Sequence, residues 1–426
     1  MRLVANRGAA LNGEARVPGD KSCSHRALIL AAMAGGETRI TGLLESDDVL
    51  ATARAIAAFG IEVERLDAGE WLVRGGGWRS PDGPVDCGNS GTAARLLVGA
   101  AAGMDGLVAT FTGDASLSSR PMRRVTAPLE RMGARIEGGD RLPLTVHGAR
   151  LGGIDHRNVP ASAQVKSAIL LAGLSTTAPV RIEEPLPSRD HSEIMLREFG
   201  VEIEGAALGE QRRLTACTLA IASDPSSAAF LLVAAAVVPG SSITVPDLLV
   251  NPLRTGLFET LETMGADLSL SNARVQSGEV VADLMLGHAI LRSCHVGAAQ
   301  IPAMIDEIPA LAVACAFADG ESVIEGLAEL KVKESDRLGA VVAGLVACGV
   351  AAVADSDALR IFGRGRVRGG ARIVTHGDHR IAMAFLTLGL GAEQPVEVDE
   401  AEMIATSFPE FVDVMRGLGA SIEERA

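Results

Sequence analysis

Long apolar runs along this chain begin abruptly after short polar segments. In VPGDKSCSHRALILAAMAGG, residues 17–36, an uncharged apolar run directly follows the polar residues Lys21, Ser22, Ser24, His25 and Arg26. A surface helix spreads its polar residues along one face, so this pattern predicts a buried helix with a polar N-terminus. Asp20 or Ser22 can cap such a helix. Alternatively, its free backbone N–H groups, together with Lys21 and Arg26, can bind an anion.

A second pattern recurs six times along the chain: a helical segment closes on an apolar residue or cysteine plus glycine, and a strand-like segment follows. The closing glycines lie 65 to 84 residues apart, at Gly60, Gly133, Gly200, Gly265, Gly349 and Gly419. Glycine in this position supplies the left-handed conformation that ends many helices. Such endings occur in any α/β protein, but six at near-constant spacing indicate an internal repeat. Each repeat is too small to bury its own apolar faces, and three could close one core, so six predict two domains.

Two segments mark where the chain is expected to pass between these domains. ASDPSSAAFLL (222–232) breaks the chain at Asp-Pro-Ser-Ser and then starts an apolar helix. The other crossing is expected near Pro18. We therefore expect a discontinuous domain of residues 1–19 and 223–426, and an inserted domain of residues 20–222, with three repeats in each.

The amino-acid composition and net charge limit the classes of protein and of partner that we expect. The chain is 48% hydrophobic and 22% charged, as is ordinary for a soluble globular protein, and its net charge is −14. This charge gives no general attraction to nucleic acid or to anionic membranes, so neither is expected as a partner. Six scattered cysteines without a C-x-x-C pair indicate reduced thiols in a cytoplasmic protein. We find no signal-peptide core at the N-terminus, and the longest apolar run, Ala228–Val238, is too short to span a bilayer.

Cations gather at the starts of several predicted helices, as they do in residues 17–36. The segments are CGNSGTAARLL (87–97), FTGDASLSSRPMRRV (111–125), ASAQVKSAILLAGL (161–174), PSRDHSEIML (187–196), KVKESDRL (331–338) and THGDHRIAMAF (375–385). Arginine is suited to bidentate binding of phosphate or carboxylate, and small residues let backbone N–H groups approach an anion. Taken by itself, each segment can also be explained as a glycine-rich turn, a helix cap or a salt-bridged helix face. The residue types alone leave both explanations open.

Metal and nucleotide sites have less support. His376 and His379 are three residues apart, but no cysteine pair or HExxH motif accompanies them. The chain has no G-x-x-x-x-G-K-[ST] loop, and no G-x-G-x-x-G follows a clear strand. We therefore expect no metal and no nucleotide cofactor.

Eight segments, in this order, resemble the 5-enolpyruvylshikimate-3-phosphate synthase family: PGDKSCSHRALILAA, GNSGTAARLL, SRPM, ASAQVKSAILLAGL, RDHSEIML, KVKESDRL, GDHRIAMAF and ATSFPEF. The resemblance extends over essentially the whole chain. It implies two inside-out α/β barrel domains, each of three βαβαββ repeats, with the active site in the cleft between them. This fold agrees with the six repeated helix endings, and the resemblance favours the anion site over simple capping in residues 17–36.

The resemblance implies a transferase of the shikimate pathway of aromatic amino-acid biosynthesis. Its substrates would be shikimate-3-phosphate and phosphoenolpyruvate. The 5-hydroxyl adds to C2 of phosphoenolpyruvate while C3 takes a proton, and the tetrahedral intermediate then loses phosphate and that proton. The reaction needs a base, an acid for carbon, and cations for two phosphates and two carboxylates, but no cofactor. We expect a monomer that binds these small molecules.

Position within each motif implies the roles of individual residues. Catalysis is implied for Lys21, Asp306 and Glu334: Asp306 would hold and help deprotonate the 5-hydroxyl, and Glu334 would pass the proton to and from C3. The phosphoenolpyruvate contacts would be Lys21, Gly91, Arg120, Gln164, Arg337 and Arg380. The shikimate-3-phosphate contacts would be Lys21, Ser22, Arg26, Ser162, Ala163, Gln164, Arg189, Asp306 and Lys333. Asp306 could instead belong only to an acidic helix start, and Glu334 could pair only with Lys331 or Arg337.

Three departures from the best-known family pattern resemble the divergent bacterial class of the enzyme. Ala163 stands where many members have Ser, Thr406 where they have Lys, and Glu329 where Asn is frequent. Gly91 is kept, whereas members that tolerate glyphosate can carry Ala there. The resemblance thus implies an enzyme that glyphosate inhibits.

Two alternative functions predict other residues at these positions. UDP-N-acetylglucosamine enolpyruvyl transferases share the fold but usually carry a reactive Cys five residues before the Arg of their Arg-Pro pair. This chain has Ala115 there, next to Asp114, and its K-x-E-x-D-R segment favours shikimate chemistry. A non-catalytic anion-binding protein would keep the cations but would not need Asp306 and Glu334 as a pair.

Overall fold

The computed structural model describes residues 1–425, which divide into two compact units. Within the described residues, the discontinuous unit comprises Met1–Pro18, Ala222–Arg274 and residues 280–425, and the inserted unit comprises Gly19–Ile221 and Val275–Glu279. The sequence analysis placed residues 275–279 in the discontinuous domain, whereas their contacts group them with the inserted unit.

The inserted unit contains three four-stranded sheets. Their strand orders are β14 (Thr218–Ala220), β3 (Gly36–Thr41), β5 (Glu70–Gly75), β4 (Glu62–Asp67); β6 (Val85–Asp86), β7 (Val108–Thr112), β9 (Leu144–His147), β8 (Arg135–Gly138); and β10 (Ile154–Arg157), β11 (Val180–Glu183), β13 (Ala207–Leu208), β12 (Ile203–Glu204). The helices are α1 (Lys21–Met33), α2 (Asp47–Ala58), α3 (Gly91–Ala102), α4 (Ala115–Ser119), α5 (Arg123–Arg131), α6 (Ala163–Gly173) and α7 (His191–Glu198).

The discontinuous unit repeats the same plan. Its strand orders are β16 (Leu268–Gln276), β17 (Glu279–Gly287), β15 (Ser242–Leu249), β2 (Asn12–Glu14); β18 (His295–Val296), β19 (Asp319–Ile324), β21 (Leu359–Arg364), β20 (Ala351–Ala354); and β22 (Arg372–Ile373), β23 (Val396–Val398), β1 (Arg2–Asn6), β24 (Ser421–Arg425). The helices are α8 (Pro225–Val237), α9 (Gly256–Thr263), α10 (Ile308–Phe317), α11 (Arg337–Ala347), α12 (His379–Gly391) and α13 (Phe411–Gly417), with 3₁₀ turns at Ala298–Ala303, Ala328–Val332 and Ala401–Thr406. In every sheet of both units, one outer strand pairs in parallel with its neighbour.

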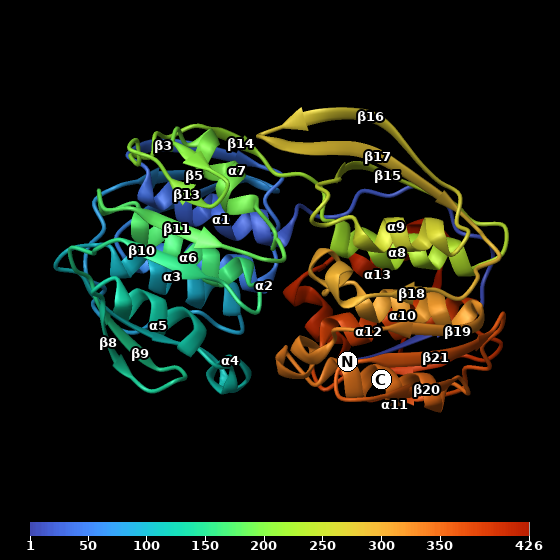
Figure 1. Ribbon diagram of the computed structural model, residues 1–426. Coiled ribbons are helices and arrows are strands. Elements are labelled where there is room, and N and C mark those ends of the chain that lie inside the picture. The colour runs from blue at the N-terminus through green and yellow to red at the C-terminus, as the bar shows by residue number, and fades with distance from the viewer. Residues whose placement is uncertain (426) are drawn as a thin grey trace. The chain divides into compact units, whose positions relative to one another are not determined.

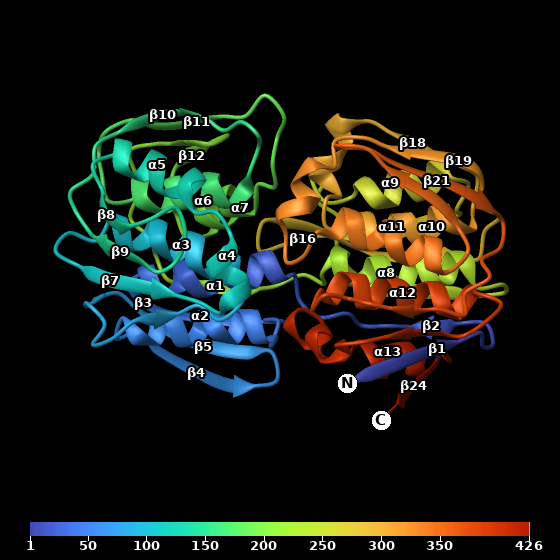
Figure 2. The same ribbon diagram turned by 90° about the horizontal axis from the view of Figure 1, so that it is seen from below.

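Six helices form the interior of the two units: α1, α3 and α6 in one, and α8, α10 and α12 in the other. All the residues of α8 and α10 are buried, and nearly all those of α12. Within each unit the sheets lie outside and these helices inside (Figures 1 and 2). Helices that are buried on every side explain the abrupt apolar runs, because no face needs a polar stripe. This is the inside-out α/β arrangement that the sequence analysis expected.

Small residues allow the inner helices to pack closely in a chain with only 3% aromatic residues. A Cβ added to Gly99 of α3 would lie 2.4 Å from the carbonyl oxygen of Ala168 in α6, so these two backbones nearly touch. Only glycine permits such an approach.

The six predicted glycine endings are confirmed. Gly60, Gly133, Gly200, Gly265, Gly349 and Gly419 have φ between 84° and 106° and follow α2, α5, α7, α9, α11 and α13, respectively. Each ending leads into the edge strand of a sheet: β4, β8, β12, β16, β20 and β24. The spacing of the glycines therefore reported a true sixfold repeat, in which every repeat has one inner helix and a further helix that ends at the glycine.

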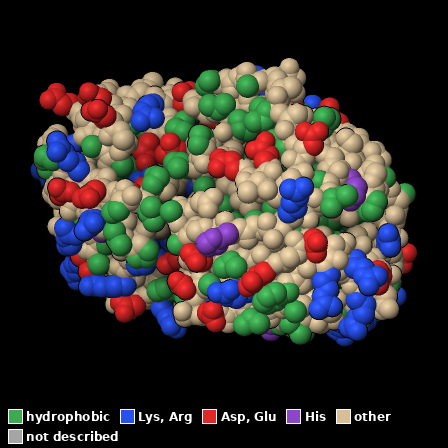
Figure 3. Space-filling model, turned by 45° about the vertical axis from the view of Figure 1, so that its right-hand side comes forward, with side chains coloured by type: hydrophobic (Ala, Val, Ile, Leu, Met, Phe, Trp, Pro, Cys, Tyr) green, Lys and Arg blue, Asp and Glu red, His purple; other side chains and the backbone are tan. Residues whose placement is uncertain are grey.

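Two observations concern the surface. Among the described residues, none of the helices combines the length and the apolar character that crossing a membrane requires. On the face shown in Figure 3, acidic and basic side chains are interspersed with hydrophobic ones.

Candidate active site

In the inserted unit, the buried side chain of Arg26 joins the first turns of three helices. Arg26 is 4% exposed. Its Nε donates to Ser192 Oγ of α7 at 2.7 Å, and its Nη2 donates to Ser167 Oγ of α6 at 2.8 Å. Its Nη1 donates to the carbonyl of Ser22 in α1 at 2.9 Å. Arg26 thus holds the helix starts together, and a direct contact with shikimate-3-phosphate stays a prediction.

His25 attaches the start of α3 to the same group of helices. Its Nδ1 lies 2.7 Å from Thr52 Oγ1 of α2, and its other ring nitrogen lies 3.5 Å from Ser90 Oγ. Ser90 is the N-cap of α3 and accepts the N–H of Ala93. Burial, followed by the charges of Lys21 and Arg26, holds the pKa of His25 well below its usual 6.5. The starts of α1, α3, α6 and α7 therefore meet around a neutral imidazole and a buried guanidinium.

Three of the predicted phosphoenolpyruvate contacts lie close together at the start of α3. A Cβ added to Gly91 would lie 3.3 Å from Arg120 Nη1 and 2.6 Å from Arg95 Nη1. Arg95 Nη1 also donates to Gln164 Oε1 at 2.8 Å. The structure thus brings together Gly91, Arg120 and Gln164, and it adds Arg95. Arg95 follows Gly91 by one helical turn, and that spacing was the signal that could have placed it in the site.

Hydrogen bonds from neighbouring loops fix the side chain of Arg120. Its Nη2 donates to Asn89 Oδ1 at 2.6 Å and to Ser116 Oγ at 3.2 Å. Asn89 in turn donates to Asp114 at 2.7 Å. Asp114 therefore supports the arginine-binding loop and caps α4, rather than standing free as an acid.

The other predicted residues of this unit lie at helix starts and are partly buried. Lys21 Nζ lies 2.5 Å from Asp48 Oδ2, with the two side chains 17% and 12% exposed. Ser162 caps α6, which continues with Ala163 and Gln164. Arg189 precedes α7 by two residues and is partly buried. Lys21 and Arg189 therefore flank the helix starts from two separate elements.

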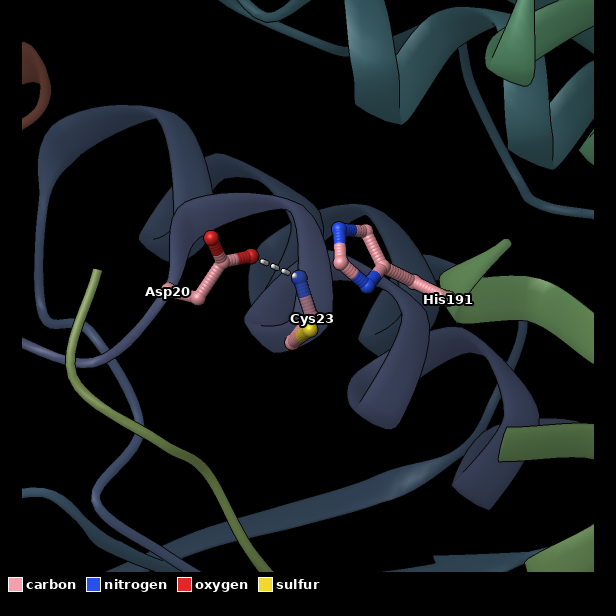
Figure 4. A group of neighbouring side chains, drawn as sticks. All are labelled: Asp20, Cys23 and His191. Carbon is pink, nitrogen blue, oxygen red and sulfur yellow. Dashed lines mark hydrogen bonds between the residues drawn. The ribbon is translucent and has the colours of Figure 1, made fainter. Parts of the chain in front are cut away.

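At the start of α1, Asp20, Cys23 and His191 bring possible metal-ligand atoms within 4.8 Å of one another (Figure 4). All three residues are buried. Cysteine, histidine and carboxylate are ordinary zinc ligands. However, Asp20 Oδ1 accepts the N–H of Cys23 at 2.7 Å as the helix cap, and His191 Nδ1 lies 2.6 Å from Glu279 Oε1. We assign this cluster to joining α1 with α7, and the absence of a metal from the site stays a prediction.

In the discontinuous unit, one arginine contacts three carboxylates. Arg337, at the start of α11, is 1% exposed. Its Nε donates to Asp378 Oδ2 at 2.8 Å, its Nη1 to Asp306 Oδ1 at 3.4 Å, and its Nη2 to Glu334 Oε2. Burial alone would lower the pKa of Arg337, but Asp378, Glu334 and Asp306 together raise it above its usual value. The two predicted proton-transfer carboxylates thus share one permanently charged partner.

The remaining predicted residues of this unit adjoin Asp306. Lys333 Nζ lies 3.5 Å from Asp306 Oδ1, and Arg380 Nη1 donates to the carbonyl oxygen of Asp306 at 2.9 Å. These contacts bring the starts of α10, α11 and α12 together. Lys331, by contrast, is exposed, and Glu334 accepts a hydrogen bond from Arg337.

Asp378 has two functions at the start of α12. It caps α12 by accepting the N–H of Arg380 at 3.0 Å. Its other oxygen accepts from Arg337 and, at 3.0 Å, from Ser335 Oγ. Its complete burial distinguishes it from an ordinary cap. That burial could not be read from the sequence.

A second buried network lies next to Asp306 in the chain. Arg254 Nη2 donates to Asp224 Oδ1 at 3.1 Å and to Ser226 Oγ at 3.0 Å. Ser226 Oγ donates to Glu307, and Arg254 Nη2 lies 3.9 Å from the same carboxylate. The network ties the start of α8 to the start of α10. Nothing in the local sequence of Arg254 distinguishes it from a surface arginine.

The fold of this chain is similar to that of a solved enolpyruvyl transferase. The enolpyruvyl transferase NikO from Streptomyces tendae has a TM-score of 0.79 with 19% identity, and the match covers 99% of this chain and 98% of NikO. At this identity the likeness establishes the fold alone. The chain has the enolpyruvyl transferase fold, with cations and carboxylates at the helix starts of each unit.

Relatives with higher sequence identity show the family to which this chain belongs. The model of the family "EPSP synthase (3-phosphoshikimate 1-carboxyvinyltransferase)" matches residues 5–415. The 3-phosphoshikimate 1-carboxyvinyltransferase of Phenylobacterium zucineum (strain HLK1) is 53% identical over 432 residues, covering 99% of this chain and 95% of that relative. The EPSP synthase structure from Acinetobacter baumannii has a TM-score of 0.87 and 39% identity, covering 99% of this chain and 100% of that one.

The chain therefore belongs to the EPSP synthase family, and it is a transferase of the shikimate pathway. The expected family, fold and enzyme class are confirmed. The alternative of a UDP-N-acetylglucosamine enolpyruvyl transferase is not favoured by these relatives.

Proposed function

We propose that the two clusters of helix starts bind the same pair of substrates, shikimate-3-phosphate and phosphoenolpyruvate. The observation that carries this proposal is the contact of Arg337 with both Asp306 and Glu334. A protein that only bound anions would gain nothing from two carboxylates competing for its buried cation. A proton-transfer reaction on an anionic substrate needs all three groups.

The inserted unit is proposed to supply most of the anion binding. Lys21, Arg120 and Arg189 accompany four helix starts, and each start presents free N–H groups and the positive end of a helix dipole. The hydrogen bonds to Asn89 and Ser116 hold the Arg120 guanidinium in a fixed orientation, which suits bidentate binding of phosphate or carboxylate. Arg95 joins this set through its bond to Gln164.

The discontinuous unit is proposed to supply the proton transfers. Asp306 lies between Lys333 and Arg337, and two adjacent cations favour its ionised form. Ionised Asp306 would accept the hydrogen bond of the substrate 5-hydroxyl and take its proton as the C–O bond forms. Glu334 would deliver a proton to C3 and remove it when phosphate leaves. A substrate carboxylate bound to Arg337 would compete with Glu334 for that guanidinium, so substrate binding would favour the protonated form of Glu334.

The experiment that tests the proposal is phosphate release by the purified protein. Phosphate should appear only when shikimate-3-phosphate and phosphoenolpyruvate are both present, and the organic product should carry the enolpyruvyl ether at the 5-position. Replacement of shikimate-3-phosphate by UDP-N-acetylglucosamine should give no phosphate. Release with the nucleotide sugar, or binding of both substrates without turnover, would contradict the proposal.

A monomeric state and a cytoplasmic location are proposed with this function. The active-site residues named above come from a single chain, so the proposed reaction requires no second subunit. Light scattering of the purified protein at the concentration used for kinetics checks the oligomeric state. A dimer mass under those conditions would contradict the monomer.

A further inference from the structure

Residues 276–279 form a tight turn that groups with the inserted unit, although the strands β16 and β17 on either side continue into the discontinuous unit. Its two central residues, Ser277 and Gly278, have φ of 45° and 78°. Two consecutive residues with positive φ are typical of the two-residue hairpin turns that fit the twist of a β-ribbon. The segment is therefore a two-residue hairpin turn between β16 and β17.

Two side chains of this turn form hydrogen bonds with the backbone of Ala220, at the end of β14. The N–H of Ala220 donates to Ser277 Oγ at 2.9 Å, and Gln276 Nε2 donates to the carbonyl of Ala220 at 3.4 Å. Gly278 lies against α7: an added Cβ would be 2.7 Å from Ile194 Cγ2. The turn thus rests on two elements of the inserted unit.

Glu279, the first residue of β17 after the turn, contacts the first residue of α7. Glu279 Oε1 lies 2.6 Å from His191 Nδ1, and the two residues are 4% and 0% exposed. For comparison, the His295–Glu325 pair lies at 3.4 Å with side chains 67% and 50% exposed. A surface pair of that kind contributes little, whereas removing one partner of a buried pair is costly.

His191 lies at a critical place in the inserted unit. Arg189 lies two residues before it, and Ser192, which follows it, accepts a hydrogen bond from Arg26. The His191 side chain also approaches Asp20 and Cys23 at the start of α1, as Figure 4 shows. The orientation of the His191 ring therefore affects the element that carries Arg189.

We propose that Glu279 is a positioning residue for shikimate-3-phosphate binding. Through His191 it fixes the first turn of α7, and so it holds Arg189 in place for the substrate. The inference rests on the proposed contact of Arg189 with shikimate-3-phosphate. Glu279 itself does not take part in the chemistry.

The test compares Glu279→Gln, Arg189→Ala and the double variant in steady-state kinetics of the full-length enzyme. Glu279→Gln should raise KM for shikimate-3-phosphate ~10- to 100-fold, as expected for a displaced binding group, and leave kcat and KM for phosphoenolpyruvate within about twofold. Because Glu279 acts through Arg189, adding Glu279→Gln to Arg189→Ala should not raise KM further. The matched control, Glu325→Gln, removes a carboxylate from the exposed pair and should leave all constants unchanged.

Each other outcome contradicts a defined part of the inference. If Arg189→Ala raises KM but Glu279→Gln does not, the positioning role is wrong and the Arg189 contact stands. If Arg189→Ala has no effect, the proposed contact and the inference both fail. Multiplicative effects in the double variant would show that Glu279 acts on the fold in general. Should Glu279→Gln not fold, Ser277→Gly removes the hydroxyl that binds Ala220, keeps a residue suited to positive φ, and should raise the same KM by a smaller factor; an unchanged KM would overturn the proposal.

Discussion

Arg337 Nη1 lies 3.4 Å from Asp306 Oδ1, and the same guanidinium also binds Glu334. One buried cation therefore connects the two carboxylates that we assign to proton transfer at oxygen and at carbon. A change of charge on either carboxylate alters the interaction that the other has with Arg337. Because the two carboxylates are coupled through Arg337, their roles can be distinguished only by replacing each carboxylate separately.

Glu334→Gln should bind both substrates nearly as well as the wild type but turn over far more slowly. The amide keeps the size of the side chain and cannot exchange a proton with C3, and a positioned acid or base contributes about 100- to 10,000-fold. Single-turnover chemistry and substrate affinity, measured separately, check this. The matched control is Glu321→Gln, which removes an exposed partner of Arg360. Near-normal turnover of Glu334→Gln would remove this residue from the mechanism.

Arg337→Gln should destabilise the fold as well as abolish activity. The substitution takes the guanidinium from Asp378, which is fully buried, and removing one partner of a buried pair costs about 3–5 kcal/mol. Urea unfolding of the protein without substrate checks the prediction. Arg360→Gln, which breaks an exposed pair with Glu321, should cost about 0–1 kcal/mol. Equal midpoints for the two variants would show that the Arg337 cluster contributes no more than a surface pair.

The hydrophobic pattern predicted more of the fold than the charged residues predicted of the site. The six glycine endings and the uncharged inner helices follow from local physical rules, so Gly60 or residues 17–36 could be interpreted without tertiary information. Arg26 has the residue type of an anion ligand, but its position in the interior depends on the packing of α1 against α7. Glu279 and His191 are 88 residues apart in the chain, and only the tertiary fold brings them together. Asp378 could be recognised as a cap but not as a partner of Arg337, because both functions use one side chain.

His25 should make the stability of the enzyme depend on pH below its usual pKa of 6.5. Burial, and then Lys21 and Arg26, keep the folded-state pKa of His25 well below that value. Below pH ~6.5 the unfolded chain therefore binds a proton that the folded chain does not, and stability falls by up to about 1.4 kcal/mol per pH unit from this group.

Urea unfolding of the wild type and His25→Gln between pH 5 and 8 measures this contribution. The stability difference between the two should be constant above pH ~6.5 and should change below it, because the variant lacks the titrating group. His295→Gln replaces an exposed histidine and controls for removal of a histidine as such. A difference between wild type and His25→Gln that is independent of pH throughout would contradict the prediction.

Gly91 should determine how the enzyme responds to glyphosate. We expect the wild type to be inhibited competitively with phosphoenolpyruvate and Gly91→Ala to be less sensitive, because the inhibitor is longer than the substrate that it mimics. A Cβ at this position would lie 2.6 Å from Arg95 Nη1 and 3.3 Å from Arg120 Nη1. Arg95 would have to move, and its bond to Gln164 would weaken with it. Strain of ~1–3 kcal/mol from an added methyl corresponds to a roughly five- to more than a hundred-fold rise in the inhibition constant.

The same displacement predicts that Gly91→Ala also raises KM for phosphoenolpyruvate, by a smaller factor than the inhibition constant. Phosphoenolpyruvate is shorter and leaves more room for the methyl group, but it still depends on Arg120 and Gln164. Gly83→Ala is the control, because a Cβ there would meet no atom within 4 Å, and it should leave both constants unchanged. Inhibition constants measured at several phosphoenolpyruvate concentrations separate the two effects. A wild type that is indifferent to glyphosate, or an inhibition constant that does not rise in Gly91→Ala, would show that residue 91 does not bound the inhibitor pocket.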